Sequence, residues 1–249
     1  MPMKRKANHL MSYFDILEAC AEPGCPLCRL SERSTDRYLA SVMGEYVNDS
    51  GTRAGLRRSL GYCNEHAWRL PDTGAGAALG IAIVYLDLLT QMLKQLRESR
   101  FDGARKMSLR RLREMLDWTV PASATEAVVQ RLHAQARCPA CARRETMERI
   151  ALVSLLEALA QDDQRMLAAL EESSGLCLPH LRQALELVRD RLAYARLVQV
   201  STGKLGELTQ ELREFIRKVD YRFNQEDRGA EQDSWQRAIA WMSGARGMR

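Results

Sequence analysis

The feature that most constrains this chain is a pattern of cysteine and histidine pairs that occurs twice. Cys25-x2-Cys28 is followed, after 34 residues, by Cys63-x2-His66. Cys138-x2-Cys141 is followed, after 35 residues, by Cys177-x2-His180. These positions include six of the seven cysteines and two of the four histidines. Because the spacing is nearly the same in both halves, we interpret the chain as a tandem duplication of one helical unit.

The residue types and their spacing predict two metal sites. A structural zinc ion takes four tetrahedral sulfur and nitrogen ligands, and a separation of two residues lets a tight turn aim both side chains at one ion. The intervals of 34 and 35 residues suit a helical hairpin that leaves the ion and returns to it. We therefore expect two zinc ions per chain, each with a Cys3His ligand set drawn from one half: Cys25, Cys28, Cys63 and His66, then Cys138, Cys141, Cys177 and His180.

Two other chemistries remain open for these thiols. An iron–sulfur cluster can also be held by cysteines with an occasional histidine. The Cys-Pro-x-Cys pairs resemble a dithiol redox motif, although no βαβ pattern surrounds them and the matching Cys-x2-His pairs would have no role. The alternative function is therefore a redox or iron–sulfur protein that uses the Cys-Pro-x-Cys thiolates. Disulfides are disfavoured because the chain shows no sign of secretion.

No motif points to a catalytic residue. The sequence lacks HExxH, G-x-S-x-G, Walker A and G-x-G-x-x-G, and the H-x-E element of zinc deaminases is missing at both Cys-x2-His pairs. Four ligands also leave no open position for a reacting water, so Glu65 would act as a base only if a ligand were displaced. An enzyme is therefore the less favoured hypothesis. Cys20, His9 and His133 lack partners at ligand spacing, and we expect Cys20 to be a buried helix residue.

Composition and periodicity predict an all-α fold, a helical bundle built from two duplicated units. The expected units are residues 1–105 and 106–249, the second with a C-terminal extension, packed as one globular body. The sequence lacks runs of alternating β-branched and aromatic residues, and Pro121 separates the halves, with Ser123 as the expected N-cap of a new helix. The expected helices span 8–20, 27–46, 52–60, 64–70, 76–99, 107–118, 124–135, 140–160, 162–173, 178–224 with a break near 201–203, and 231–243.

Two apolar stretches are expected to be core. Residues 75–93 are apolar but contain Asp87 and Gln91, so a buried helix explains them better than a membrane span. Trp235, Ile239 and Met242 follow the i, i+4, i+7 spacing of one helix face, which we also assign to the core. The N-terminal stretch has no apolar segment typical of a signal peptide, so the predicted location is the cytoplasm, without membrane contact.

Basic residues are concentrated between the halves. The segment 97–113 holds seven basic and two acidic residues, a balance equal to the net charge of +5 of the whole chain. It is either a solvated helix face or a contact for nucleic acid or another anionic partner. The basic residues are Arg97, Arg100, Arg105, Lys106, Arg110, Arg111 and Arg113. The resulting functional prediction is a zinc-stabilised scaffold for a macromolecular partner, protein or nucleic acid.

The sequence also resembles a bacterial family of unknown function. The resemblance rests on "CPLC … GYCNEH", "CPAC … GLCLPHL" and the C-terminal "FIRKVDYRFNQEDRGAEQDSWQRAIAWMSG", and it spans most of the chain. It implies a shared helical metalloprotein. It implies nothing about a substrate.

Overall fold

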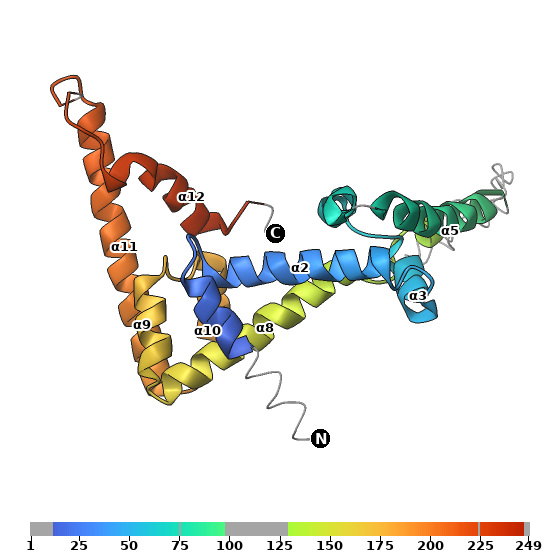
Figure 1. The fold of residues 1–249 in the computed structure, drawn as a ribbon, viewed down its shortest axis with the longest axis horizontal. Helices are drawn as coiled ribbons and strands as arrows, with labels where there is room; N and C mark the ends of the chain where they lie inside the picture. Colours follow the sequence, from blue (N-terminus) through green and yellow to red (C-terminus); the bar gives the residue numbers. More distant parts are fainter. Residues whose placement is uncertain (1–11, 75, 98–128, 224, 247–249) are drawn as a thin grey trace, which may run out of the picture. The chain divides into compact units, whose positions relative to one another are not determined.

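The protein is described by a computed structural model that covers residues 12–74, 76–97, 129–223 and 225–246. These residues form helices and turns and contain no β-strand, which confirms the expected all-α class (Figure 1). The segments expected to form helices at 107–118 and 124–128, together with the expected cap at Ser123, lie outside the described residues.

The helices belong to two compact units whose limits differ from the expected division at residue 105. Unit 1 consists of residues 1–35 and 143–249, and unit 2 consists of residues 36–142. Both boundaries fall inside helices, namely α2 (Pro26–Gly44) and α8 (Pro139–Ala160). Each unit therefore combines segments from both halves of the sequence. The duplication of a helical unit stays a prediction.

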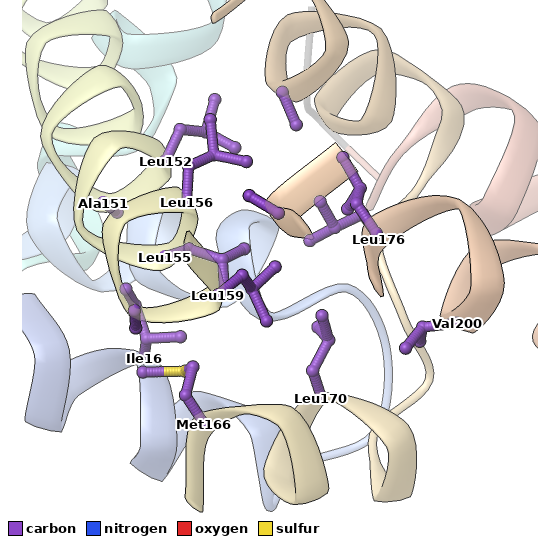
Figure 2. Close-up of a cluster of buried hydrophobic side chains, with 14 of the residues drawn as sticks. Ile16, Ala151, Leu152, Leu155, Leu156, Leu159, Met166, Leu170, Leu176 and Val200 are labelled. Atoms are coloured by element: carbon purple, nitrogen blue, oxygen red, sulfur yellow. The ribbon is translucent and has the colours of Figure 1, made fainter. Parts of the chain in front are cut away.

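The core of unit 1 is built around α8 (Figure 2). Leu152, Leu155 and Leu159 follow a helical repeat on one face of α8 and are completely or almost completely buried. Ile16 and Met166 pack into the same cluster. The remaining helices of unit 1 are the one that includes residues 12–20, α9 (Gln164–Glu172), α10 (Leu178–Leu187), α11 (Arg191–Val219) and α12 (Ser234–Ser243), preceded by the 3-10 helix η2 (Ala230–Asp233).

Unit 2 has a smaller core that includes Leu39, Leu56 and Val84. Arg57 joins two of its helices, because its guanidinium donates two hydrogen bonds of 2.8 Å to the Asp87 carboxylate. Besides parts of α2 and α8, the described helices of this unit are α3 (Ser50–Ser59), α4 (Asn64–Trp68), the 3-10 helix η1 (Leu70–Thr73) and α5 (Ala77–Arg97).

The expectation that residues 75–93 form a buried helix is wrong. Helix α5 buries one face, with Val84 and Leu88 in the core, while Leu86 on another face is 67% exposed. Apolar side chains lie on more faces of α5 than the rest of unit 2 covers. The other large apolar side chains exposed along α5 are Leu79, Leu89, Leu93 and Leu96. By length and composition alone, α5 is long and apolar enough to cross a membrane. No other helix in the part of the chain that the structure describes meets these two criteria.

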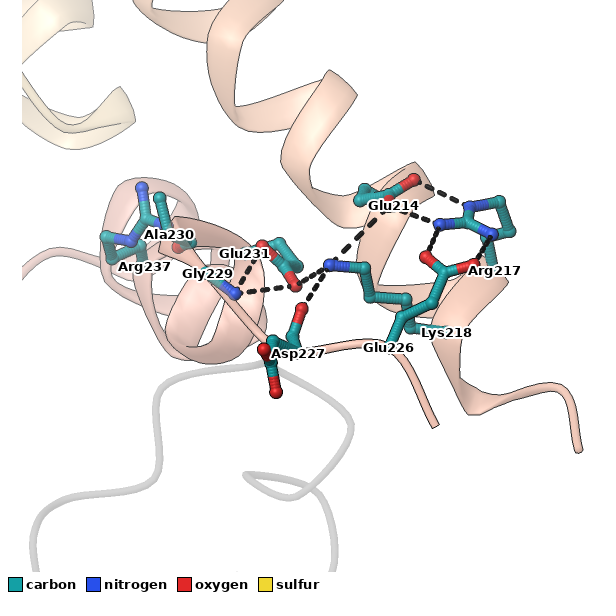
Figure 3. Close-up of polar contacts among 9 residues, drawn as sticks. All are labelled: Glu214, Arg217, Lys218, Glu226, Asp227, Gly229, Ala230, Glu231 and Arg237. Atoms are coloured by element: carbon teal, nitrogen blue, oxygen red, sulfur yellow. Dashed lines mark hydrogen bonds and ion pairs between the residues drawn. The ribbon is translucent and has the colours of Figure 1, made fainter. Parts of the chain in front are cut away.

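Residues 226–231, which follow α11, are held against that helix by ion pairs (Figure 3). Lys218 lies 2.8 Å from the Glu231 carboxylate and donates to the carbonyl of Asp227. Arg217 pairs with Glu214 on its own helix and with Glu226 in the loop that follows. The carboxylate of Glu231 also accepts the backbone N–H of Gly229. The segment is thus a docked, salt-bridged structure rather than a free helix end.

Two further expectations in the C-terminal region are wrong. Helix α11 continues through Ser201 and Gly203, and the chain breaks earlier, where Asp190 accepts the first N–H groups of α11 at its N-cap. Ser201 is accommodated within the helix because its hydroxyl donates to the carbonyl of Leu197 at 2.7 Å. The stripe on α12 is not core: Trp235, Ile239 and Met242 are each about half exposed.

Candidate metal centres

The structure brings all eight candidate ligands together, but not in the expected groups. Cys25, Cys28, Cys177 and His180 form the first site, in unit 1. Cys63, His66, Cys138 and Cys141 form the second site, in unit 2. The ligand atoms of each site lie within 4.8 Å of one another. The expected grouping within each half of the sequence is therefore wrong, because each Cys-x2-Cys pair meets the Cys-x2-His pair of the other half.

Helix lengths explain why neighbouring pairs do not meet. Helix α2 has 19 residues and begins between Cys25 and Cys28, so it carries the chain about 28 Å away from them. Helix α3 has 10 residues, about 15 Å, so it spans only about half of that distance toward the start of α2. The same holds in the second half, where α8 has 22 residues and α9 has nine.

Each site is formed by the N-terminal ends of two helices. Cys63 is the N-cap of α4 and Cys177 is the N-cap of α10, each with an extended backbone, and each is followed by its histidine in the first helical turn. The Cys-x2-Cys pairs begin just before α2 and α8, where Pro26 and Pro139 occupy the first helical position. Helix N-termini favour negative charge, so this placement stabilises the thiolates that bind metals.

Glycines set the turns that lead into the Cys-x2-His pairs. Gly61 and Gly175 have φ values of 90° and 71°, a region that other residues enter only with strain. Each lies two residues before its ligand cysteine. The repeated Gly-x-Cys-x2-His sequence therefore encodes the same local turn at both sites.

The distances within the first site match a single tetrahedral ion. Zinc–sulfur and zinc–nitrogen bonds of about 2.3 and 2.05 Å place two sulfurs about 3.8 Å apart and a sulfur about 3.6 Å from a nitrogen. The Sγ atoms of Cys28 and Cys177 are 3.7 Å apart. The Nδ1 atom of His180 is 3.5 Å from the Sγ atoms of Cys25 and Cys28, and 3.1 Å from that of Cys177. The backbone N–H of Ala245 donates to Cys28 Sγ at 3.4 Å.

The second site has the same geometry. The Sγ atoms of Cys63 and Cys141 are 3.7 Å apart. The Nδ1 atom of His66 lies 3.1, 3.4 and 3.7 Å from the Sγ atoms of Cys63, Cys141 and Cys138. In both sites the histidine therefore presents Nδ1 to the sulfurs and turns Nε2 outward.

In the second site, a negative charge on one thiol makes it harder for a neighbouring thiol to ionise. Burial by itself raises the pKa of the Cys138 thiol, but hydrogen bonds from His66 and from backbone N–H groups lower it to about 6. Burial, the charge of Cys138 and the contact with Cys63 raise the pKa of Cys141 to about 12. A cation among the sulfurs removes this conflict, because it stabilises every thiolate at once.

The first site likewise favours positive charge. Burial by itself lowers the pKa of His180, but contacts with Cys177, Cys25, Cys28 and Glu148 raise it well above its ordinary value. Surroundings that favour a proton on the ring also favour a metal cation beside it. A metal ion that replaces the protons could supply this positive charge in either site.

A buried carboxylate supports the histidine of the first site. Glu148 Oε1 lies 3.6 Å from His180 Nε2 and accepts a hydrogen bond of 2.9 Å from the Ser31 hydroxyl. Arg144 Nε lies 3.8 Å from the same oxygen. Burial by itself raises the pKa of Glu148, but these three neighbours hold it below its ordinary value, so the carboxylate stays ionised.

The sequence does not indicate this group of residues around His180. Arg144 and Glu148 have the i, i+4 spacing that is usual for a surface ion pair, and nothing in the sequence shows that both side chains are buried. Ser31 is separated from Glu148 by 117 positions. A buried acid on α8 becomes recognisable only when its contact with His180 is known.

The other candidate residues lie away from the two sites or outside the described residues. Cys20 belongs to the core of unit 1, and burial, with a smaller contribution from Cys25, raises the pKa of its thiol to about 11. His133 is exposed, and Arg97 is exposed at the end of α5. His9 and the remaining basic residues expected to contact an anionic partner lie outside the described residues: Arg100, Arg105, Lys106, Arg110, Arg111 and Arg113.

The model of a family of unknown function (DUF6062) matches residues 10–248. No significant match is found among curated proteins or among solved structures.

Proposed function

Because the chain belongs to this family of unknown function, we propose its function from its own residues: it is a zinc protein with two structural Cys3His centres that serves as a scaffold for a macromolecular partner. The observation that carries the metal part is the convergence of two four-ligand groups at tetrahedral spacing. Each group lies within one compact unit and joins segments far apart in the sequence. An ion at such a position stabilises the fold directly.

The ligand geometry favours a single ion over an iron–sulfur cluster. A cluster distributes its cysteine ligands over different iron atoms and therefore needs its sulfurs farther apart than one ion does. The sulfur–sulfur distance of 3.7 Å in each site suits one ion. Three sulfurs and one nitrogen complete a tetrahedral shell, so the proposed role of the ion is structural.

The scaffold role rests on large apolar side chains that remain exposed on two helices. Leu86 and Leu93 are exposed on α5, and Trp235 and Ile239 on α12. Exposed apolar surface of this extent is typical of interaction sites. The basic segment 97–113 adds the narrower proposal of nucleic-acid contact.

Elemental analysis of protein purified without oxygen tests the metal proposal. We expect two zinc ions per chain and a colourless protein. The Cys28→Ser and Cys63→Ser variants should each retain one ion, whereas Cys20→Ala, which changes a buried cysteine outside both sites, should retain two. A brown protein that contains iron and sulfide would contradict the proposal.

Binding of a labelled DNA or RNA duplex at increasing salt tests the nucleic-acid proposal. Phosphate contacts release counterions, so the affinity should fall steeply as the salt concentration rises. Replacement of the seven basic residues of segment 97–113 by glutamine should reduce the steepness of that dependence. Affinity that does not depend on salt would contradict a phosphate contact.

A further inference from the structure

The two sites differ in the surroundings of the outer nitrogen of their histidines. In the first site, His180 Nε2 faces the carboxylate of Glu148, which is 7% exposed and held by Ser31 and Arg144. In the second site, His66 is completely buried, and its Nε2 atom has no hydrogen-bond partner within the described residues. A carboxylate oxygen of Glu65 lies 3.9 Å from this nitrogen.

The two carboxylates are not equivalent. Glu148 comes from α8, a different helix from that of His180, and its carboxylate is held near Nε2 by two neighbours, Ser31 and Arg144. Glu65 is the sequence neighbour of His66, and its side chain is 24% exposed to water. A buried charge interacts with the ring more strongly than one that water screens, so Glu148 has the larger effect despite similar distances.

This difference acts on the metal through the imidazole. With Nδ1 directed at the sulfurs, the proton of the ring lies on Nε2, where a carboxylate holds the tautomer and orientation and makes Nδ1 a better donor. In the second site the buried Nε2–H meets no acceptor within the described part of the chain, which opposes the orientation that metal binding requires. Loss of such an outer partner typically weakens metal binding by about 10–100-fold.

We infer that Glu148 is a positioning residue that makes the first site the tighter of the two, and that the second site exchanges its ion. The inference rests on the proposed zinc function. Unit 1 then keeps its ion, while unit 2 gains or loses order with the zinc supply, because metal binding at such a site is folding free energy. The class of signal that unit 2 reads is the concentration of a free divalent cation.

Competition between the zinc-loaded full-length protein and a chromophoric zinc chelator tests the inference. We expect two steps of release, separated by about 10–100-fold in chelator concentration. Alkylation of released thiols, followed by mass spectrometry, identifies the site that opens first. Cys63, Cys138 and Cys141 should be labelled in the first step, and Cys25, Cys28 and Cys177 in the second.

Variants of the outer carboxylates sharpen the test. Glu148→Ala should weaken the first site so that both ions leave in one range of chelator concentration. Glu148→Gln keeps the size and an acceptor but loses the charge, so it should have a smaller effect. The matched control is Glu65→Gln, which should leave both steps in place. Nitrogen-15 spectra of histidine should show a slowly exchanging Nε2–H for His180 that Glu148→Ala makes exchange faster.

The possible failures are distinguishable. A protein that binds no zinc contradicts the proposed function itself. A protein that binds two ions and releases both in one step contradicts the inference alone. So does labelling of Cys25, Cys28 and Cys177 first, or a Glu148→Ala variant that releases zinc like the wild type.

Discussion

The first and second sites use the same ligand types at the same distances, yet their histidines are supported differently. Both place Nδ1 of the histidine 3.1 Å from the Sγ atom of the cysteine three residues before it. Beyond that shell the similarity ends. Glu148, buried beside Arg144, lies 3.6 Å from His180 Nε2, whereas His66 Nε2 has no hydrogen-bond partner within the described residues.

The ligands of each site and the residues that support its histidine are specified in different ways. The inner shell depends on short motifs, because Gly-x-Cys-x2-His and Cys-Pro-x-Cys each specify a local turn at a helix N-terminus. The outer shell depends on tertiary contacts between α2, α8 and α10, which a short motif does not contain. Two sites can therefore share a motif and differ in how strongly they hold a metal.

The largest expected effects come from the ligands, and they test the separation of the two units. Cys177→Ser should lose the ion of the first site and unfold unit 1, because structural zinc contributes about 10–16 kcal/mol in small domains, as much as a typical total stability. Cys63→Ser should do the same to unit 2. Hydrogen exchange followed by mass spectrometry measures which segments lose protection. Loss of protection at α3 in the Cys177→Ser variant would contradict the observed grouping.

Truncation of a buried leucine should cost more stability in the core of unit 1 than in the smaller core of unit 2. Leu155→Ala in unit 1 should cost about 3–5 kcal/mol, and Leu56→Ala in unit 2 about 2–3 kcal/mol, because the more enclosed site collapses less around a cavity. Urea unfolding in excess zinc measures both values. Equal costs would show that the two cores are packed alike.

Alanine substitutions of two glycines should change stability by smaller amounts, with opposite signs in the two units. A Cβ atom at Gly80 of α5 would lie 2.6 Å from the Met43 carbonyl oxygen, so Gly80→Ala should destabilise unit 2 by about 1–3 kcal/mol. At Gly203 of α11 a Cβ atom meets nothing within 4 Å. Gly203→Ala should therefore stabilise unit 1 by up to about 1 kcal/mol. Thermal unfolding measures both, and a stabilising Gly80→Ala would contradict the close approach of α5 to Met43.

The smallest expected effect concerns acid pH and compares ion pairs of the two units. The Lys218 contact comes first among the causes that lower the pKa of Glu231 to about 2. A lowered pKa means that the stabilisation is present above the ordinary value near 4.5 and is lost as the pH falls toward 2. The difference in Tm between wild type and Glu231→Gln should therefore be constant above about pH 5 and shrink below it.

Asp87→Asn in unit 2 provides the control for that experiment. The hydrogen bond with Arg57 comes first among the causes that lower the pKa of Asp87. Its contribution is likewise present above the ordinary value near 3.8 and is lost as the carboxylate becomes protonated. A difference between wild type and Glu231→Gln that grows toward pH 2 would contradict the ion pair with Lys218.

Much of the helical structure follows from the sequence, with small shifts at the ends. The sequence predicts helices at 140–160 and 231–243, for example, and the structure has Pro139–Ala160 and, after η2, Ser234–Ser243. The break expected at Ser201–Gly203 occurs instead just before Asp190. A serine and a glycine lower helix propensity only slightly within a long helix, while an N-cap aspartate starts a new one.

Helix periodicity does not determine which apolar faces are buried. The apolar periodicity of α5 and α12 shows which residues share a face, but not whether another element covers that face. The apolar pattern predicts that Leu86 and Ile239 are buried, but both are exposed. Apolar residues are common on protein surfaces, so an apolar stripe predicts a core only together with its neighbours.

The sequence by itself determined the helical class and the eight residues that could bind metal, because ligand spacing and helix signals are local properties of the chain. Only the tertiary structure decided which pairs share a site, since the length of α2 carries Cys63 away from Cys28 and Cys25. It also decided the unequal support of the two histidines. Glu148 reaches His180 through the packing of α8 against α10, and that contact depends on chain segments that no local motif connects.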